Sequence, residues 1–124
     1  MSDSHARGME LRRQVLGDEH VDRSEAGRTP FTADFVDYFV RSAWGEVWAR
    51  PGLDLRTRSC ITVAMLIALN RPEELRMHVR GALRNGVTVD ELKEILLQSA
   101  VYCGVPAAND GFRVAREIVE SEPG

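Results

Sequence analysis

Glycine and proline residues divide this chain into short segments, and in nearly every segment the apolar residues have helical spacing. The dividing residues are Gly17, Gly45, Pro72, Gly86, Gly104 and Pro106. Apolar residues three or four positions apart share one face of a helix, whereas strict alternation is typical of a strand. The pattern therefore predicts an all-α protein of about six helices, folded as a single domain over residues 1–124.

The segment boundaries predict where each helix begins and ends. The expected ranges are 4–16, 32–45, 54–69, 72–85, 88–103 and 106–120. Residues 17–30 are polar and are expected to form a loop with at most one helical turn. The 54–69 segment is apolar on every side beyond Ser59, so we expect it to be the central buried helix. Thr88 and Glu91 have the spacing of a capping box, which predicts a well-defined helix start.

Charge and hydropathy exclude several classes of partner. A formal net charge of -3 leaves no basic excess for binding a nucleic-acid backbone. The longest apolar run, residues 60–69, is about half of a membrane span, and the first residues lack the apolar stretch of a secretory signal. We therefore expect a cytoplasmic protein with no membrane or nucleic-acid partner, in which Cys60 and Cys103 are free thiols in apolar surroundings.

One face of the predicted 72–85 helix combines an acid with a histidine. Glu74 and His78 are four residues apart, so the carboxylate can hold the imidazole in one tautomer. The alternative is an ordinary surface ion pair. Arg80 points about 160° away from His78 on the same helix, which indicates either a solvated basic face or a role in a neighbouring subunit's site.

The predicted 88–103 helix carries a second polar face. Glu94, Gln98 and Tyr102 fall within an arc of about 80° between apolar neighbours, which favours a half-buried pocket wall. The alternatives are a solvated face or a contact between subunits. Arg58, near the start of the 54–69 helix, is a candidate for binding an anion, unless it and Arg56 merely pair with nearby acids.

Common catalytic motifs are missing from the sequence. There is no glycine-rich phosphate loop and no serine nucleophile motif. His5, His20 and His78 are too dispersed for a metal-ligand cluster, so no metal site is predicted, and His20 is interpreted as a solvated histidine.

Several long stretches of the chain resemble the carboxymuconolactone decarboxylase family, within the wider alkylhydroperoxidase D-like group. The matching stretches are RRQVLGDEHVDR (12–23), WGEVWARPGLDLRTRS (44–59) and EELRMHVRGALRNGVTVDELKEILLQSAVYCGVPAAN (73–109). The resemblance implies an all-α fold and assembly as a homotrimer or homohexamer. It also implies decarboxylation of γ-carboxymuconolactone to the β-ketoadipate enol-lactone in protocatechuate catabolism, with no cofactor.

The peroxidases of the wider group differ from this chain at decisive positions. They use a C-x-x-C pair, a later histidine and an upstream glutamate. Cys103 matches the first cysteine and Glu91 the upstream glutamate, but Pro106 and Asp110 stand where the second cysteine and the histidine would be. A dithiol cycle on one chain cannot close without the second thiol. Cys103 is therefore interpreted as a pocket-lining residue, and thiol peroxidase activity is the alternative function.

The resemblance turns the two polar faces into a hypothesis about catalysis. His78, oriented by Glu74, is expected to deliver a proton, with Glu94 as a second acid or base. Tyr102 and Gln98 would donate hydrogen bonds to the lactone oxygen or to a carboxylate, Arg58 would anchor a carboxylate, and Arg80 would serve a neighbouring subunit. A third possibility is a binding or assembly protein that shares the scaffold without its catalysis.

Overall fold

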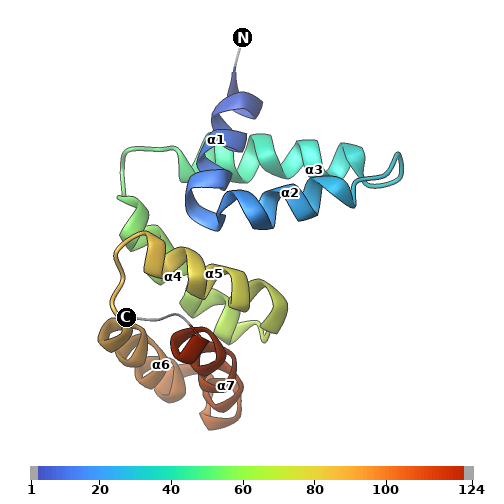
Figure 1. The fold of residues 1–124 in the computed structure, drawn as a ribbon. Helices are drawn as coiled ribbons and strands as arrows, with labels where there is room; N and C mark the ends of the chain where they lie inside the picture. Colours follow the sequence, from blue (N-terminus) through green and yellow to red (C-terminus); the bar gives the residue numbers. More distant parts are fainter. Residues whose placement is uncertain (1–2, 122–124) are drawn as a thin grey trace. The chain divides into compact units, whose positions relative to one another are not determined.

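The computed structural model describes residues 3–121, which are helical and form two compact units with no strand in the described part (Figure 1). The unit that ends at Asp54 contains α1 (Ser4–Leu16), α2 (Asp18–Ala26), α3 (Ala33–Phe39) and the π-helix η1 (Val40–Trp48). The unit that begins at Leu55 contains α4 (Leu55–Ala68), α5 (Pro72–Arg84), α6 (Val89–Cys103) and α7 (Val105–Ser121). The all-α prediction is confirmed, with seven α-helices and one π-helix in place of about six helices; the single domain stays a prediction.

In the N-terminal unit, α1 and η1 cross at two glycines. A Cβ atom on Gly8 would lie 2.1 Å from the Val40 carbonyl oxygen, and one on Gly45 would lie 2.0 Å from the Ser4 carbonyl oxygen. The backbones of the two helices are thus too close for any side chain at the crossing. The Arg7 guanidinium donates a hydrogen bond to the Gly45 carbonyl there, at 3.1 Å.

The expectation of a loop over residues 17–30 is wrong, because α2 occupies residues 18–26. Val21 is its one fully buried residue, so the helix has almost no apolar periodicity to detect. Its polar side chains stabilise it in ways that hydropathy does not report. Asp18 and Asp22 both pair with Arg13 of α1, at 3.1 and 2.9 Å.

Asp37 binds two basic side chains in the N-terminal unit. It accepts hydrogen bonds from Arg28, at 2.8 Å, and from His5, at 3.1 Å. The Arg28 hydrogen bond, assisted by that of His5, holds the pKa of the Asp37 carboxyl below its usual value. The charged form therefore stabilises the folded state.

We expect Asp37→Asn to destabilise the protein near neutral pH and to have less effect in acid. A lowered folded-state pKa contributes stability above the unfolded pKa, about 4, and this contribution is lost as the pH falls through the folded pKa. Thermal unfolding of both proteins at pH 7 and pH 3 measures the effect. Asp34→Asn, at an exposed position of the same helix, is the control. A difference between wild type and Asp37→Asn that does not shrink in acid would exclude the pair as its source.

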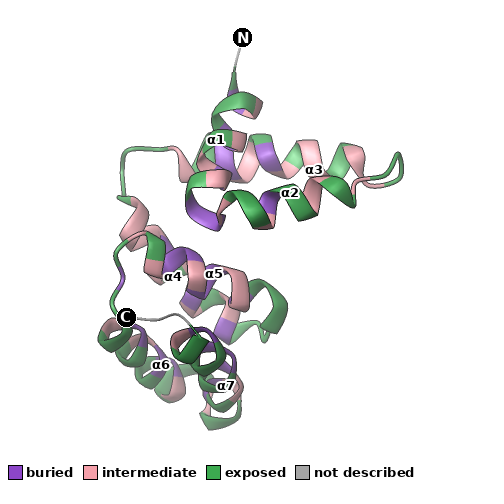
Figure 2. Cartoon of the chain, viewed as in Figure 1, coloured by how far each residue is buried: buried purple, intermediate pink, exposed green. Residues whose placement is uncertain are grey.

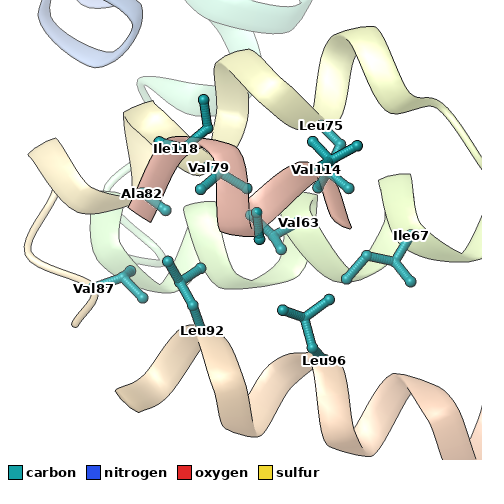
Figure 3. Close-up of a cluster of buried hydrophobic side chains, with 11 residues drawn as sticks. Val63, Ile67, Leu75, Val79, Ala82, Val87, Leu92, Leu96, Val114 and Ile118 are labelled. Atoms are coloured by element: carbon teal, nitrogen blue, oxygen red, sulfur yellow. The ribbon is translucent and has the colours of Figure 1, made fainter. Parts of the chain in front are cut away.

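The C-terminal unit packs around one apolar core to which all four helices contribute (Figure 3). Its members include Val63 and Ile67 of α4, Val79 of α5 and Leu96 of α6. The buried positions form one stripe along each helix, with exposed positions on the other sides (Figure 2). Both α5 and α6 pack on α4 and on α7. The polar groups of α5 and α6 are therefore carried on helices whose main contacts are with α4 and α7.

The prediction that the 54–69 helix is buried all round is wrong. Only Ser59, Val63 and Ile67 of α4 are buried. Two apolar side chains on its other sides are exposed, Ile61 by 39% and Met65 by 57%, and Leu69, directly after the helix, is exposed by 67%. The helix α4 thus has more apolar surface than the rest of its own chain covers.

The predicted ends of α5 and α6 are confirmed. Gly86 and Gly104 have φ of 93° and 96°, a conformation that favours glycine and terminates the preceding helix. At the start of α6, the Glu91 backbone N–H donates to the Thr88 hydroxyl at 3.1 Å. The Thr88 backbone N–H in turn donates to the Glu91 carboxylate at 2.9 Å, which completes the capping box.

Candidate functional site

His78 is a buried polar residue on a helix that is mostly amphipathic. It is 7% exposed and lies beside Val79 on the buried side of α5, which begins at Pro72. Asn85, two turns further along the same face, donates a hydrogen bond to the buried Ser59 hydroxyl of α4 at 2.9 Å. The face of α5 that carries His78 is therefore turned toward α4.

Glu74 lies one turn before His78 and is exposed. The two residues thus differ in environment, with the His78 imidazole inside and the Glu74 carboxylate at the surface.

The arginines near the start of α4 have different surroundings. Arg56 forms an ion pair with Glu91, which is also the capping-box residue of α6. Arg58 is partly buried, and its Nε atom is inaccessible to solvent. Arg56 is thus used to fix the start of α6 against α4, and Arg58 stays the predicted anion-binding residue. Arg80, on α5, is also partly buried.

The polar face of α6 is not half buried as predicted. Glu94, Gln98 and Tyr102 are exposed in this chain, Tyr102 by 84%. Within one chain, α5 and α6 each pack mainly on α4 and α7, and His78 does not line the pocket that contains Gln98 and Tyr102. Helical periodicity grouped these three residues on one face of α6 but did not indicate that this face is exposed in the chain.

A pocket of about 340 Å³ lies between α4 and α6. Three residues of α4 form one wall: Cys60, Ile61 and Ala64. Five residues of α6 form the other: Ile95, Gln98, Ser99, Tyr102 and Cys103. The pocket combines apolar walls with an amide and two hydroxyl groups, the mixture typical of small-molecule sites. It brings together Gln98 and Tyr102 of the predicted site, whereas His78, Glu74, Glu94, Arg58 and Arg80 are not in its lining.

The sequence analysis missed Cys60, Ala64 and Ser99 as pocket residues. Their signal was present in the spacing, because residues 60, 61 and 64 share a face of α4 as residues 95, 98, 99 and 102 share one of α6. Which helices are neighbours was the missing information. Cys103, expected in apolar surroundings, is exposed, and both cysteines are free thiols.

The residues that match the peroxidase pattern have structural partners here. Glu91 caps α6 and pairs with Arg56. Asp110, at the position of the peroxidase histidine, pairs with Arg113 at 2.7 Å. Among residues 3–121, no group of three or more His, Cys, Asp and Glu side chains is arranged to hold a metal ion. Within the same range, no helix is both long and apolar enough to cross a membrane.

Comparison with known proteins identifies the class to which this helical scaffold belongs. The family description "Carboxymuconolactone decarboxylase family" matches residues 33–117, which is more than half of the chain. The chain therefore belongs to the carboxymuconolactone decarboxylase family.

Two curated relatives match most of the chain. A 4-carboxymuconolactone decarboxylase from Acinetobacter baylyi is 49% identical over 92% of this chain and 85% of the relative. A nitrosuccinic acid decarboxylase from Metarhizium robertsii is 40% identical over 90% of this chain and 78% of the relative. Both relatives are named for the removal of carbon dioxide.

Proposed function

We propose that this protein is a carboxy-lyase that converts 4-carboxymuconolactone to the β-ketoadipate enol-lactone in the cytoplasmic catabolism of protocatechuate. The observation that carries the proposal is the 49% identity, over 92% of the chain, to a relative named for this reaction. The family match over residues 33–117 supports the same class of chemistry.

The substrate can accept its own electrons. The departing carboxylate is on the lactone γ-carbon, and the conjugated C=C–C=O of the ring receives the electron pair as carbon dioxide leaves. The protein has three tasks: to bind the carboxylates, to stabilise the developing charge on the lactone oxygen, and to deliver a proton to the ring α-carbon. None of these tasks requires a cofactor.

The predicted site residues supply groups suited to each task. His78 is the proton donor, and its burial at 7% exposure supports the assignment because water then competes less for the proton. Glu74 orients it, and Glu94 is a second acid or base. Gln98 and Tyr102 donate hydrogen bonds to the lactone oxygen, and pocket geometry supports their acting together. Arg58 anchors the carboxylate that is retained.

Assembly of several copies would unite these groups. Within one chain His78 is on the face of α5 turned toward α4 and does not line the pocket that contains Gln98 and Tyr102, so groups from a second copy would complete the site. Apolar side chains left exposed on α4 and α6, such as Met65 and Val101, supply surface for such a contact. We propose a homotrimer or homohexamer in which Arg80 reaches a neighbouring subunit's site. Light scattering on the purified protein measures the assembly directly.

The proposed reaction is tested by a turnover assay on the purified protein. Treated with chelator and given 4-carboxymuconolactone, the protein is expected to release one carbon dioxide per enol-lactone formed. In deuterium oxide, the product should carry deuterium at the ring α-carbon. Complete absence of turnover would overturn the assignment.

The 40% identical relative gives a specific second candidate, decarboxylation of nitrosuccinic acid. A nitro group is also an electron sink, so the two reactions make similar demands on a protein. Parallel measurement of kcat/KM for the two substrates decides between them. The thiol peroxidase alternative is not favoured, because the partners of Glu91 and Asp110 are structural. Peroxidase activity that is present in the wild type and absent from Cys103→Ser would support the thiol peroxidase alternative.

A further inference from the structure

The pocket between α4 and α6 contains no charged residue type. Its eight lining residues are cysteines, aliphatic residues, and one each of Gln, Ser and Tyr. Its volume, about 340 Å³, is at the lower end of the range of about 300–1,000 Å³ for small-molecule sites. A carboxylate bound there would meet no cation among the lining residues. The pocket therefore suits an uncharged ring.

We propose that this pocket holds the lactone ring, with the lactone carbonyl oxygen toward α6 and the γ-carbon toward α4. The inference rests on the proposed function and assigns one part of the substrate to one part of the fold. The α6 wall carries the hydrogen-bond donors, the Gln98 amide and the Tyr102 hydroxyl. The α4 wall offers only a thiol and aliphatic groups.

This orientation places the departing carboxylate against the α4 wall. Cys60, Ile61 and Ala64 provide no cation to stabilise the carboxylate charge. Loss of that charge into neutral carbon dioxide is then favoured by the surroundings. The retained carboxylate must project out of the pocket toward a cation such as Arg58. Ala64 becomes a specificity-determining residue, because its small side chain leaves the space that the γ-substituent occupies.

The two cysteines make occupancy of the pocket measurable. Each thiol lines the pocket and is free, so alkylation by iodoacetamide reports access to it. The probe ligand is γ-butyrolactone-γ-carboxylate, a saturated lactone that lacks the electron sink and cannot be decarboxylated. We expect it to slow alkylation of the remaining thiol in both Cys60→Ser and Cys103→Ser, at least tenfold and with saturation.

A matched pair of variants tests the position of the γ-substituent. Ala64→Leu should fill the α4 wall and weaken binding of the saturated lactone at least tenfold, measured by thiol protection. Ala68→Leu adds the same side chain to the same helix at an exposed position outside the pocket, and should change binding less than twofold. Thermal unfolding of each variant shows whether the fold is retained. Equal effects of the two substitutions would overturn the placement.

The outcomes separate this inference from the proposed function. Protection of the thiols without turnover of 4-carboxymuconolactone would contradict the proposed reaction and support the lactone pocket. Turnover that the saturated lactone inhibits, with no protection of either thiol, would locate the ring elsewhere and overturn the inference. Absence of both protection and inhibition would overturn it as well.

Discussion

Replacing His78 with alanine is expected to lower kcat for carbon dioxide release by about 10²–10⁴-fold, the usual contribution of a general acid or base. His78 is the only histidine of the C-terminal unit and is 7% exposed, so no other imidazole there can substitute for it. Substrate binding should change much less than kcat, because the proton is needed only in the transition state. Steady-state kinetics of purified wild type and variant provide the measurement.

Two further variants distinguish proton delivery from packing. His78→Gln retains much of the side-chain volume and its hydrogen-bonding groups but cannot act as an acid, so it should be nearly as slow as His78→Ala. A kcat close to that of wild type in His78→Gln would remove His78 from the chemistry. Circular dichroism and thermal unfolding of both variants show whether the fold survives the loss of a buried side chain.

Adjacent glutamates on α5 provide a control for the positioning role of Glu74. Glu74→Gln should lower kcat with little change in thermal stability, because an exposed carboxylate contributes little to folding. Glu73→Gln, one residue earlier, removes a carboxylate that pairs with Arg76 at 2.8 Å, and should leave kcat within about twofold of wild type. Equal kcat values for the two variants would show that Glu74 does not orient His78.

The sequence was sufficient for elements whose ends are encoded locally. The bounds of α1 were predicted as found, and α6 follows from Thr88, Glu91 and Gly104, residues that act within one turn of the chain. In α2, by contrast, there is no apolar face, because only one residue is buried and acidic side chains form ion pairs with Arg13. Such a helix has no apolar periodicity in the sequence. The π-helical turn of residues 40–48 likewise leaves no simple pattern in the sequence.

The same distinction between local and long-range information applies to the candidate site. Periodicity identified which side chains share a face, and Gln98 and Tyr102 do line one pocket. It could not show that α4 provides the opposite wall, because the choice of neighbouring helices depends on packing of the whole core. The catalytic hypothesis placed His78 and Glu94 in one site, whereas neither residue lines the pocket between α4 and α6 within one chain.

Replacing Gly8 with alanine is expected to destabilise the protein by about 3 kcal/mol or more, at the upper end of the cost of overpacking. The new Cβ would lie 2.1 Å from the Val40 carbonyl oxygen and 2.8 Å from the Gly45 backbone nitrogen. Both are backbone atoms, so relief requires the helices α1 and η1 to separate. Thermal unfolding should show a decrease in Tm of about 10 °C or more.

Gly27→Ala is the matched control, because its Cβ would lie 3.7 Å from the Ser24 carbonyl oxygen, an ordinary contact, and its φ of -87° is open to alanine. Its Tm should stay within a few degrees of wild type, and a similar decrease in both variants would contradict the crossing as the cause. Gly45→Ala places a methyl group 2.0 Å from the Ser4 carbonyl oxygen and forces apart the same two helices. Once either alanine has separated them, the second meets less resistance. The double variant should therefore lose less stability than the sum of the single losses, whereas independent sites would give additive losses.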